Sequence, residues 1–126
     1  MPRFVVLEHT GHPDDPEGGR HFDLLLEDGS SCRTWKMAQL PCSGGDAVVA
    51  RELPPHRLAW LETEAGEVSG NRGFARRVAA GGYRLIASDS PELRSASDVV
   101  VEIEGTDLCG RLHCREFAEG WSLRLD

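Results

Sequence analysis

Two histidines and one aspartate near the N-terminus have the residue types and the spacing of a metal site. His21 and Asp23 are two residues apart in an apolar, strand-like run. Because side chains alternate along an extended chain, both would lie on one face of the strand and could converge on one cation. His9 ends the preceding strand-like run, so neighbouring strands would bring it to the same end of the sheet as His21. Two imidazoles and one carboxylate suit a divalent transition metal with open positions for water and substrate.

An ordinary surface pair is the alternative explanation for a histidine and an aspartate in one strand. The other face of the strand is apolar and would anchor it in the core through Phe22, Leu24 and Leu26. Four polar residues in the segment between the two histidines could supply further ligands, although a flexible polar loop explains them more simply: His12, Asp14, Asp15 and Glu17.

His56 is a further candidate site residue. It follows Leu53-Pro54-Pro55, whose stiff backbone could present one imidazole and is equally suited to turning a corner. The glycine-rich segment 66–73 lacks the Gly-Lys-Ser/Thr ending of a phosphate-binding P-loop. It predicts a turn that lets its backbone or Arg72 approach a ligand.

The charge balance restricts the partners. Fourteen basic residues against 21 acidic ones give a net charge of −7, which argues against indiscriminate binding to nucleic-acid backbones. Residues 68–88 nevertheless contain no acidic residue. Four arginines in this stretch would give a hairpin an anion-attracting face, unless they cluster there by chance: Arg72, Arg76, Arg77 and Arg84.

The four cysteines do not have the spacing of a zinc site. A site built from them and His113 would lack the usual CxxC pairs. Since no secretory signal precedes them, we expect reduced thiols that behave as small core residues. They are Cys32, Cys42, Cys109 and Cys114.

Length and patterning predict one all-β, mainly antiparallel domain over residues 1–126. The chain is 40% hydrophobic and 28% charged, which is ordinary usage for a folded domain. Short alternating runs separated by Gly, Pro, Asp and Ser suggest a barrel or sandwich with short hairpins, and Ser90–Arg94 could add one helical turn. No apolar run is long enough to span a membrane, and no signal peptide is visible, so we expect a cytoplasmic protein without a membrane partner.

Ten strands are expected from these runs: Arg3–Glu8, Phe22–Glu27, Cys32–Met37, Ala47–Glu52, Leu58–Glu62, Phe74–Ala79, Tyr83–Ala87, Val99–Glu104, Leu108–Phe117 and Trp121–Leu125. Hairpin turns are expected where tight turns favour glycine with positive φ, at Asp28-Gly29, Gly81-Gly82, Glu104-Gly105 and Glu119-Gly120.

In this order, the segments resemble the 3′-phosphoesterase module of bacterial ligase D, an end-joining repair enzyme, over nearly the whole chain. The N-terminal motifs that carry the resemblance are Phe4–His9, His21–Glu27, Asp28-Gly29 and Arg33-Thr34-Trp35. The later motifs are His56–Trp60, Glu64–Gly66, Ser69–Gly73, Gly81–Tyr83, Leu108–Arg111 and Trp121–Leu123.

The resemblance implies a compact β-barrel that uses Mn²⁺ to remove a 3′-phosphate or a terminal ribonucleotide from DNA. It assigns the metal ligands to His9, His21 and Asp23, at one rim of the barrel, and the phosphate-contacting histidine to His56. Affinity order alone would favour copper or zinc over Mn²⁺, and another divalent transition metal such as Zn²⁺ or Co²⁺ is the alternative cofactor. The implied partners are DNA or RNA–DNA 3′ ends and a separate ligase or polymerase of end joining.

Three departures from the family pattern bear on activity. Leu25 stands where the family has an arginine, Trp60 stands where it has a tyrosine, and the loop between the metal histidines is longer. We therefore expect the phosphate contacts to move to Arg57, Arg72 or Arg76. A catalytically impaired module that binds nucleic-acid ends, and a phosphoesterase for a small phosphorylated substrate, are the alternatives.

Overall fold

Antiparallel pairing of short strands closes the chain into an eight-stranded β-barrel, as expected from the sequence. The computed structural model describes residues 1–126. The strands are β1 (Arg3–Thr10), β2 (Arg20–Asp28), β3 (Ser31–Met37), β4 (Val48–Arg57), β5 (Ala65–Glu67), β6 (Phe74–Ser88), β7 (Asp98–Gly105), β8 (Cys109–Phe117) and β9 (Gly120–Leu125). Two 3₁₀ turns, η1 (Leu58–Leu61) and η2 (Leu93–Ser95), are the only helical elements.

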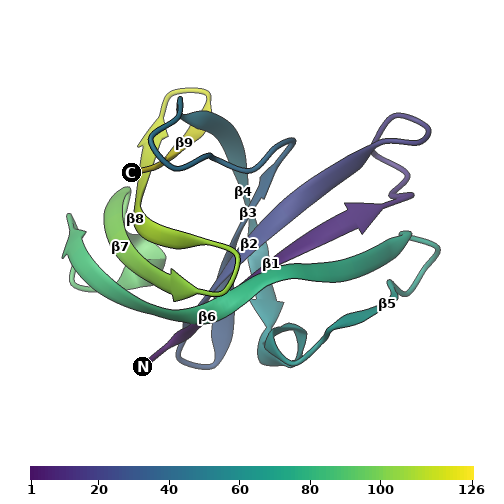
Figure 1. Ribbon diagram of the computed structural model, residues 1–126, viewed down its shortest axis with the longest axis horizontal. Coiled ribbons are helices and arrows are strands. Elements are labelled where there is room, and N and C mark those ends of the chain that lie inside the picture. Colours follow the sequence, from purple (N-terminus) through teal and green to yellow (C-terminus); the bar gives the residue numbers. More distant parts are fainter.

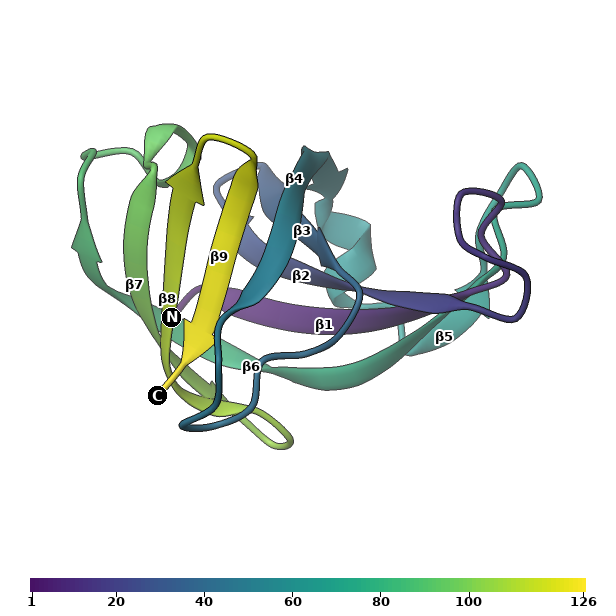
Figure 2. The ribbon, with the colours of Figure 1, turned by 90° about the horizontal axis from the view of Figure 1, so that it is seen from above.

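The barrel order is β1-β2-β3-β4-β9-β8-β7-β6, and β6 pairs back onto β1 to close it (Figure 1). β5 adds to the free end of β6 outside the barrel. Figure 2 shows β1, β2 and β6 extending beyond the β7–β8–β9 side of the barrel. The loop after β1 and the β5–β6 turn meet there, since a Cβ on Gly73 would lie 2.0 Å from the carbonyl oxygen of Thr10. No helix has the length and apolar character needed to cross a membrane.

β2 separates two apolar clusters. Phe22, Leu24 and Leu26 face the barrel interior, where they join a core of 21 buried residues. The alternate residue Leu25 faces outward and belongs to a second cluster that lies outside the barrel and is partly covered by η1. This outer cluster consists of Val5, Leu7, Leu25, Cys32 and Leu61. The alternation predicted for β2 is therefore confirmed, and the outer face of the sheet has a small core of its own.

The expected hairpin turn at Gly81-Gly82 is wrong, because residues 74–88 form one continuous strand. β6 pairs with β1 up to Gly82 and with β7 from Gly81 onward. A Cβ on Gly81 would lie 2.2 Å from the carbonyl oxygen of Glu104. The glycines thus allow the close approach of a neighbouring backbone where the strand changes partners.

The expected strand Leu58–Glu62 is also wrong, because this segment forms the 3₁₀ turn η1. Residues three apart lie on the same side of a 3₁₀ helix, and this spacing directs both Leu58 and Leu61 toward the outer cluster. Packing on that cluster therefore overrides the apolar alternation that suggested a strand.

The cysteines are all free and only half of them behave as predicted. Cys32 and Cys114 are buried, whereas Cys42 and Cys109 are exposed. Burial raises the pKa of the Cys114 thiol to about 12, so this thiol stays protonated at neutral pH. No cysteine takes part in a cluster of metal-ligating side chains.

Candidate metal centre

The register of β1 and β2 brings the predicted trio together. His9 and His21 are directly paired residues of the two antiparallel strands, and Leu7 pairs with Asp23. His9, His21 and Asp23 each offer a ligand atom, and these atoms all lie within 4.8 Å of one another. The three side chains lie near the end of the strands, on the outer face of the sheet that carries Leu25. No other group of three or more histidine, cysteine or acidic side chains comes together in this way.

The two imidazoles lie on either side of one carboxylate. Nε2 of His9 is 3.0 Å from Oδ2 of Asp23, and Nε2 of His21 is 3.5 Å from its Oδ1. The two rings stack with centroids 4.7 Å apart and planes 12° from parallel. Both Nε2 atoms and the carboxylate oxygens therefore face a common point, which is the arrangement that a divalent cation requires.

Buried polar atoms without partners support this fit. Both ring nitrogens of His9 and the Oδ1 atom of Asp23 are buried and have no hydrogen-bond partner. The short His9–Asp23 contact lacks the geometry of a hydrogen bond. Because buried polar atoms are almost always satisfied in folded proteins, these unpartnered atoms fit a cation coordinated between the three side chains.

Electrostatics keeps Asp23 ionised. Burial by itself would raise the pKa of this carboxyl, but the imidazoles of His21 and His9 lower it to about 2. The group is therefore a carboxylate at neutral pH, the form that binds metal ions.

Asp15 orients His21, a role that sequence reasoning missed when it assigned the residue to a flexible loop. Its Oδ2 atom lies 2.6 Å from Nδ1 of His21, and its Oδ1 atom lies 3.5 Å from the ammonium of Lys36. Burial alone would raise the pKa of Asp15, but His21 and Lys36 lower it. The carboxylate therefore accepts a hydrogen bond from Nδ1–H and leaves the Nε2 lone pair facing Asp23. The pKa of His21 is raised, because Asp23 and Asp15 together outweigh the opposing effect of burial.

His56 reaches the same carboxylate from β4. Its Nε2 atom lies 3.8 Å from Oδ2 of Asp23, and its side chain is 24% exposed. Nδ1 lies 3.0 Å from the carbonyl oxygen of Pro54. A carbonyl oxygen only accepts hydrogen bonds, so Nδ1 carries the proton and Nε2 is free to exchange one with a ligand. The stiff Pro54-Pro55 backbone thus presents the imidazole, one of the two possibilities left open by the sequence.

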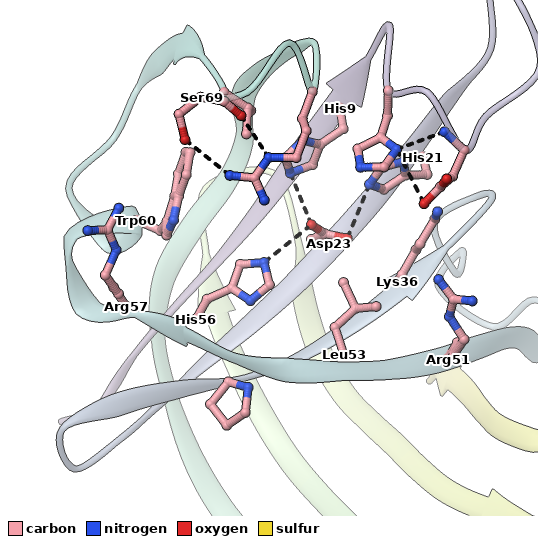
Figure 3. Close-up of a pocket in the computed structure, with 15 residues that line it drawn as sticks. His9, His21, Asp23, Lys36, Arg51, Leu53, His56, Arg57, Trp60 and Ser69 are labelled. Carbon is pink, nitrogen blue, oxygen red and sulfur yellow. Dashed lines mark hydrogen bonds and ion pairs between the residues drawn. The ribbon is translucent and has the colours of Figure 1, made fainter.

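The trio and His56 line a cavity of about 370 Å³ (Figure 3). Its walls carry four cationic side chains but only two carboxylates, those of Asp14 and Asp23, although the chain as a whole is acidic. The cations are Lys36, Arg51, Arg57 and Arg72.

The three arginines of the cavity differ from most other arginines of the chain because they form no ion pair with a carboxylate. Nine of the 13 arginines lie within 4.0 Å of a carboxylate. Arg51, Arg57, Arg72 and Arg84 have no such partner, and the first three of them line the cavity. Arg72 is held in place by the β5–β6 turn, since its Nε–H donates to the carbonyl oxygen of Ser69 at 2.7 Å. The cavity thus holds three of the four arginines that have no carboxylate partner.

The predicted phosphate-binding arginines are only partly brought together. Arg57 and Arg72 line the cavity, but Arg76 does not and instead pairs with Glu8 at 3.2 Å. The acid-free stretch therefore does not act as one anion-attracting face. Sequence reasoning also missed Lys36 and Arg51, whose cross-strand pairing depends on the register between β3 and β4.

The two residues that differ from the ligase D pattern, Leu25 and Trp60, lie in different surroundings. Leu25 is fully buried in the outer cluster, so the position of the family arginine is filled by apolar packing. Trp60 is half-buried, packs beside the same cluster and lines the cavity. The positive charge of the cavity consequently comes from other strands and turns.

Comparisons of the chain with models of known protein families and with curated proteins give no match. Membership of the ligase D family therefore stays a prediction based on the motifs.

Proposed function

We propose that this protein is a divalent-metal-dependent phosphoesterase that removes a 3′-phosphate or a 3′-terminal ribonucleotide from DNA ends in repair, with Mn²⁺ as its cofactor. The observation that carries the proposal is the position of the His9–His21–Asp23 trio in a cavity lined by arginines without carboxylate partners. Such a cavity selects an anionic group and brings it to the trio.

The size of the cavity supports a substrate of nucleotide dimensions. A volume of about 370 Å³ lies at the lower end of the range of roughly 300–1,000 Å³ that ligand pockets occupy. One terminal nucleotide and its phosphate fit this range. Trp60 gives the cavity one aromatic surface, which suits a nucleobase or a sugar.

Each residue would have a distinct part in hydrolysis. A divalent cation bound to the trio would polarise the phosphoryl oxygens and lower the pKa of a water molecule. Arg57 and Arg72 would bind the phosphate and stabilise the charge that develops on it. His56 would exchange a proton through Nε2 with the leaving oxygen, and Asp15 would hold the His21 ring in orientation.

The buried Leu25 favours a second candidate, a module that binds nucleic-acid ends without turnover. An arginine at this position would offer a bidentate phosphate contact, and leucine offers none. This candidate shares the cavity and the trio with the first, so only an assay for product separates them.

The proposal is tested by incubating the protein and Mn²⁺ with a 3′-phosphorylated primer on a template and measuring the phosphate released. We expect release that depends on the metal and is abolished by His21→Ala and by Asp23→Ala. His113→Ala is a matched control, because His113 is a partly exposed histidine that pairs with Asp126 and does not line the cavity. It should act at the wild-type rate.

Three other outcomes would reject the proposal as stated. Equal rates in the wild type and both trio variants would assign the activity to a contaminant or to another site. Binding of the primer without product would favour the binding module. Hydrolysis of free nucleotides in preference to the primer would indicate a phosphoesterase for small substrates.

A further inference from the structure

Two like charges lie side by side next to the metal trio. Lys36 on β3 and Arg51 on β4 are directly paired residues, and Lys36 is also the cross-strand partner of Asp23. Both side chains line the cavity. Like charges directly opposite one another destabilise a sheet, so this juxtaposition calls for an anion that would compensate it.

The protein itself supplies little compensation. Arg51 has no carboxylate within 4.0 Å, and Lys36 approaches only Asp15, at 3.5 Å. The other oxygen of Asp15 already accepts the hydrogen bond from His21 at 2.6 Å. The side chain of Lys36 is only 19% exposed, so its ammonium is poorly placed to be screened by solvent. The pair thus keeps a net positive charge at this wall of the cavity.

The Lys36–Arg51 pair lies well away from Arg57 along β4. Arg51 and Arg57 are six residues apart on β4, which corresponds to roughly 20 Å of extended backbone. His56 lies between them, next to Asp23. Figure 3 shows Lys36 and Arg51 on one side of Asp23, and Arg57 and Trp60 on the other. The two groups of cations therefore approach Asp23 from opposite sides, an arrangement that suits two separate anionic groups.

We propose that Lys36 and Arg51 form a second anion subsite, which binds an internal phosphodiester of the strand whose terminal phosphate lies at the trio. The inference rests on the proposed function and specifies its substrate as a nucleic-acid strand rather than a free nucleotide. The strand would run along β4 from Arg51 toward His56. Since the chain carries a net charge of −7, the unpaired cations of this cavity would favour the approach of a polyanion to this part of the surface.

Hydrolysis of two substrates tests the subsite. Thymidine 3′-monophosphate has one phosphate, whereas a 3′-phosphorylated tetrathymidylate adds internal phosphodiesters. For Arg51→Gln we expect kcat/KM to fall about tenfold or more for the tetranucleotide, as for the loss of one charge-assisted hydrogen bond, and to fall much less for the mononucleotide. Lys36→Gln should lower kcat/KM on both substrates, because Lys36 also contacts Asp15, and should lower it further on the tetranucleotide. Arg84→Gln is the matched control, an unpaired arginine outside this cavity that should alter neither rate. Arg51→Lys should restore part of the preference.

Binding tests the subsite without turnover. The probe is fluorescein-labelled tetrathymidylate with a 3′-hydroxyl, measured by fluorescence anisotropy between about 50 and 200 mM salt. Loss of one phosphate contact lowers the slope of log affinity against log salt by about 0.7 for a single strand. We expect this decrease for Arg51→Gln and Lys36→Gln, but not for Arg84→Gln.

The two assays separate failure of the inference from failure of the proposed function. If neither substrate is hydrolysed, the proposed function is wrong, and the salt slopes alone decide whether the subsite exists. If both substrates are hydrolysed but each Gln variant loses the same factor on both, or leaves the salt slope unchanged, the subsite is overturned.

Discussion

The hydrogen bond between Asp15 and His21 should control metal affinity. Asp15→Asn keeps the size of the side chain and removes its charge. In the wild type, Oδ2 lies 2.6 Å from Nδ1 of His21, and the Asp15 side chain is only 9% exposed. The carboxylate thus acts at short range, where solvent weakens it little. Without it, the imidazole would lose both its fixed orientation and part of the basicity of Nε2.

The size of the effect follows from these contacts. A hydrogen bond to a charged, largely buried group contributes about 1.5–3 kcal/mol, and partners that orient metal-ligating histidines typically change metal affinity by about 10–100-fold. Asparagine can still accept a hydrogen bond through its amide oxygen. We therefore expect Asp15→Asn to weaken Mn²⁺ binding by about tenfold and Asp15→Ala by up to about 100-fold.

Isothermal titration of Mn²⁺ into each variant at neutral pH measures this affinity directly. Asp14→Asn is the matched control. It removes the same charge from the neighbouring residue, whose side chain is 74% exposed and whose nearest basic partner is His12 at 3.8 Å. It should leave the affinity close to that of the wild type. Circular dichroism would verify that all variants keep the β-sheet signal.

Two results would refute this reasoning. If Asp15→Asn binds Mn²⁺ as tightly as the wild type, the hydrogen bond does not orient a metal ligand. If Asp14→Asn weakens binding equally, the effect comes from the overall charge of the cavity and not from the contact with His21.

Two further predictions concern the barrel. Gly81→Ala should lower the free energy of unfolding, measured in urea, by about 1–3 kcal/mol, because its Cβ would lie 2.2 Å from a carbonyl oxygen, whereas Gly66→Ala has no atom within 4 Å and should change it little. Tyr83, the single tyrosine, is buried and donates its hydroxyl to the carbonyl oxygen of Glu27, and burial raises its pKa. Unfolded tyrosine ionises near about pH 10, so the unfolded state loses this proton first and stability falls as the pH rises beyond that value. A pH series of thermal melts would measure this fall, which should be smaller in Tyr83→Phe. An equal fall in the wild type and in Tyr83→Phe would contradict the assignment.

Local alternation was enough to predict the trio. The period of two along β2 assigned His21 and Asp23 to one face, and the apolar residues between them to the core. The position of His9 needed only that consecutive strands be neighbours, which is common in antiparallel sheets. The sequence could therefore supply both the fold class and the three residues that the structure brings together.

Features that depend on distant residues could not be predicted. Gly81-Gly82 is compatible with a tight turn or with a close backbone approach, and contact with Glu104 in β7 decides between them. Asp15 was missed because nothing in its own loop indicates that the side chain folds back onto His21. The separation of Arg76 from the cavity could not be predicted either, because its pairing with Glu8 depends on the β1–β6 register that closes the barrel.

The two faces of β2 differ in function, which allows them to be redesigned separately. One face fills the barrel, and the other carries His21 and Asp23 beside Leu25 of the outer cluster, so the barrel interior can be altered separately from the candidate chemistry within a single nine-residue segment. Interior substitutions offer a means of tuning thermal tolerance with the reactive groups left untouched. Conversely, exchanging His21 and Asp23 alone would change the candidate ligand set and leave both apolar clusters intact.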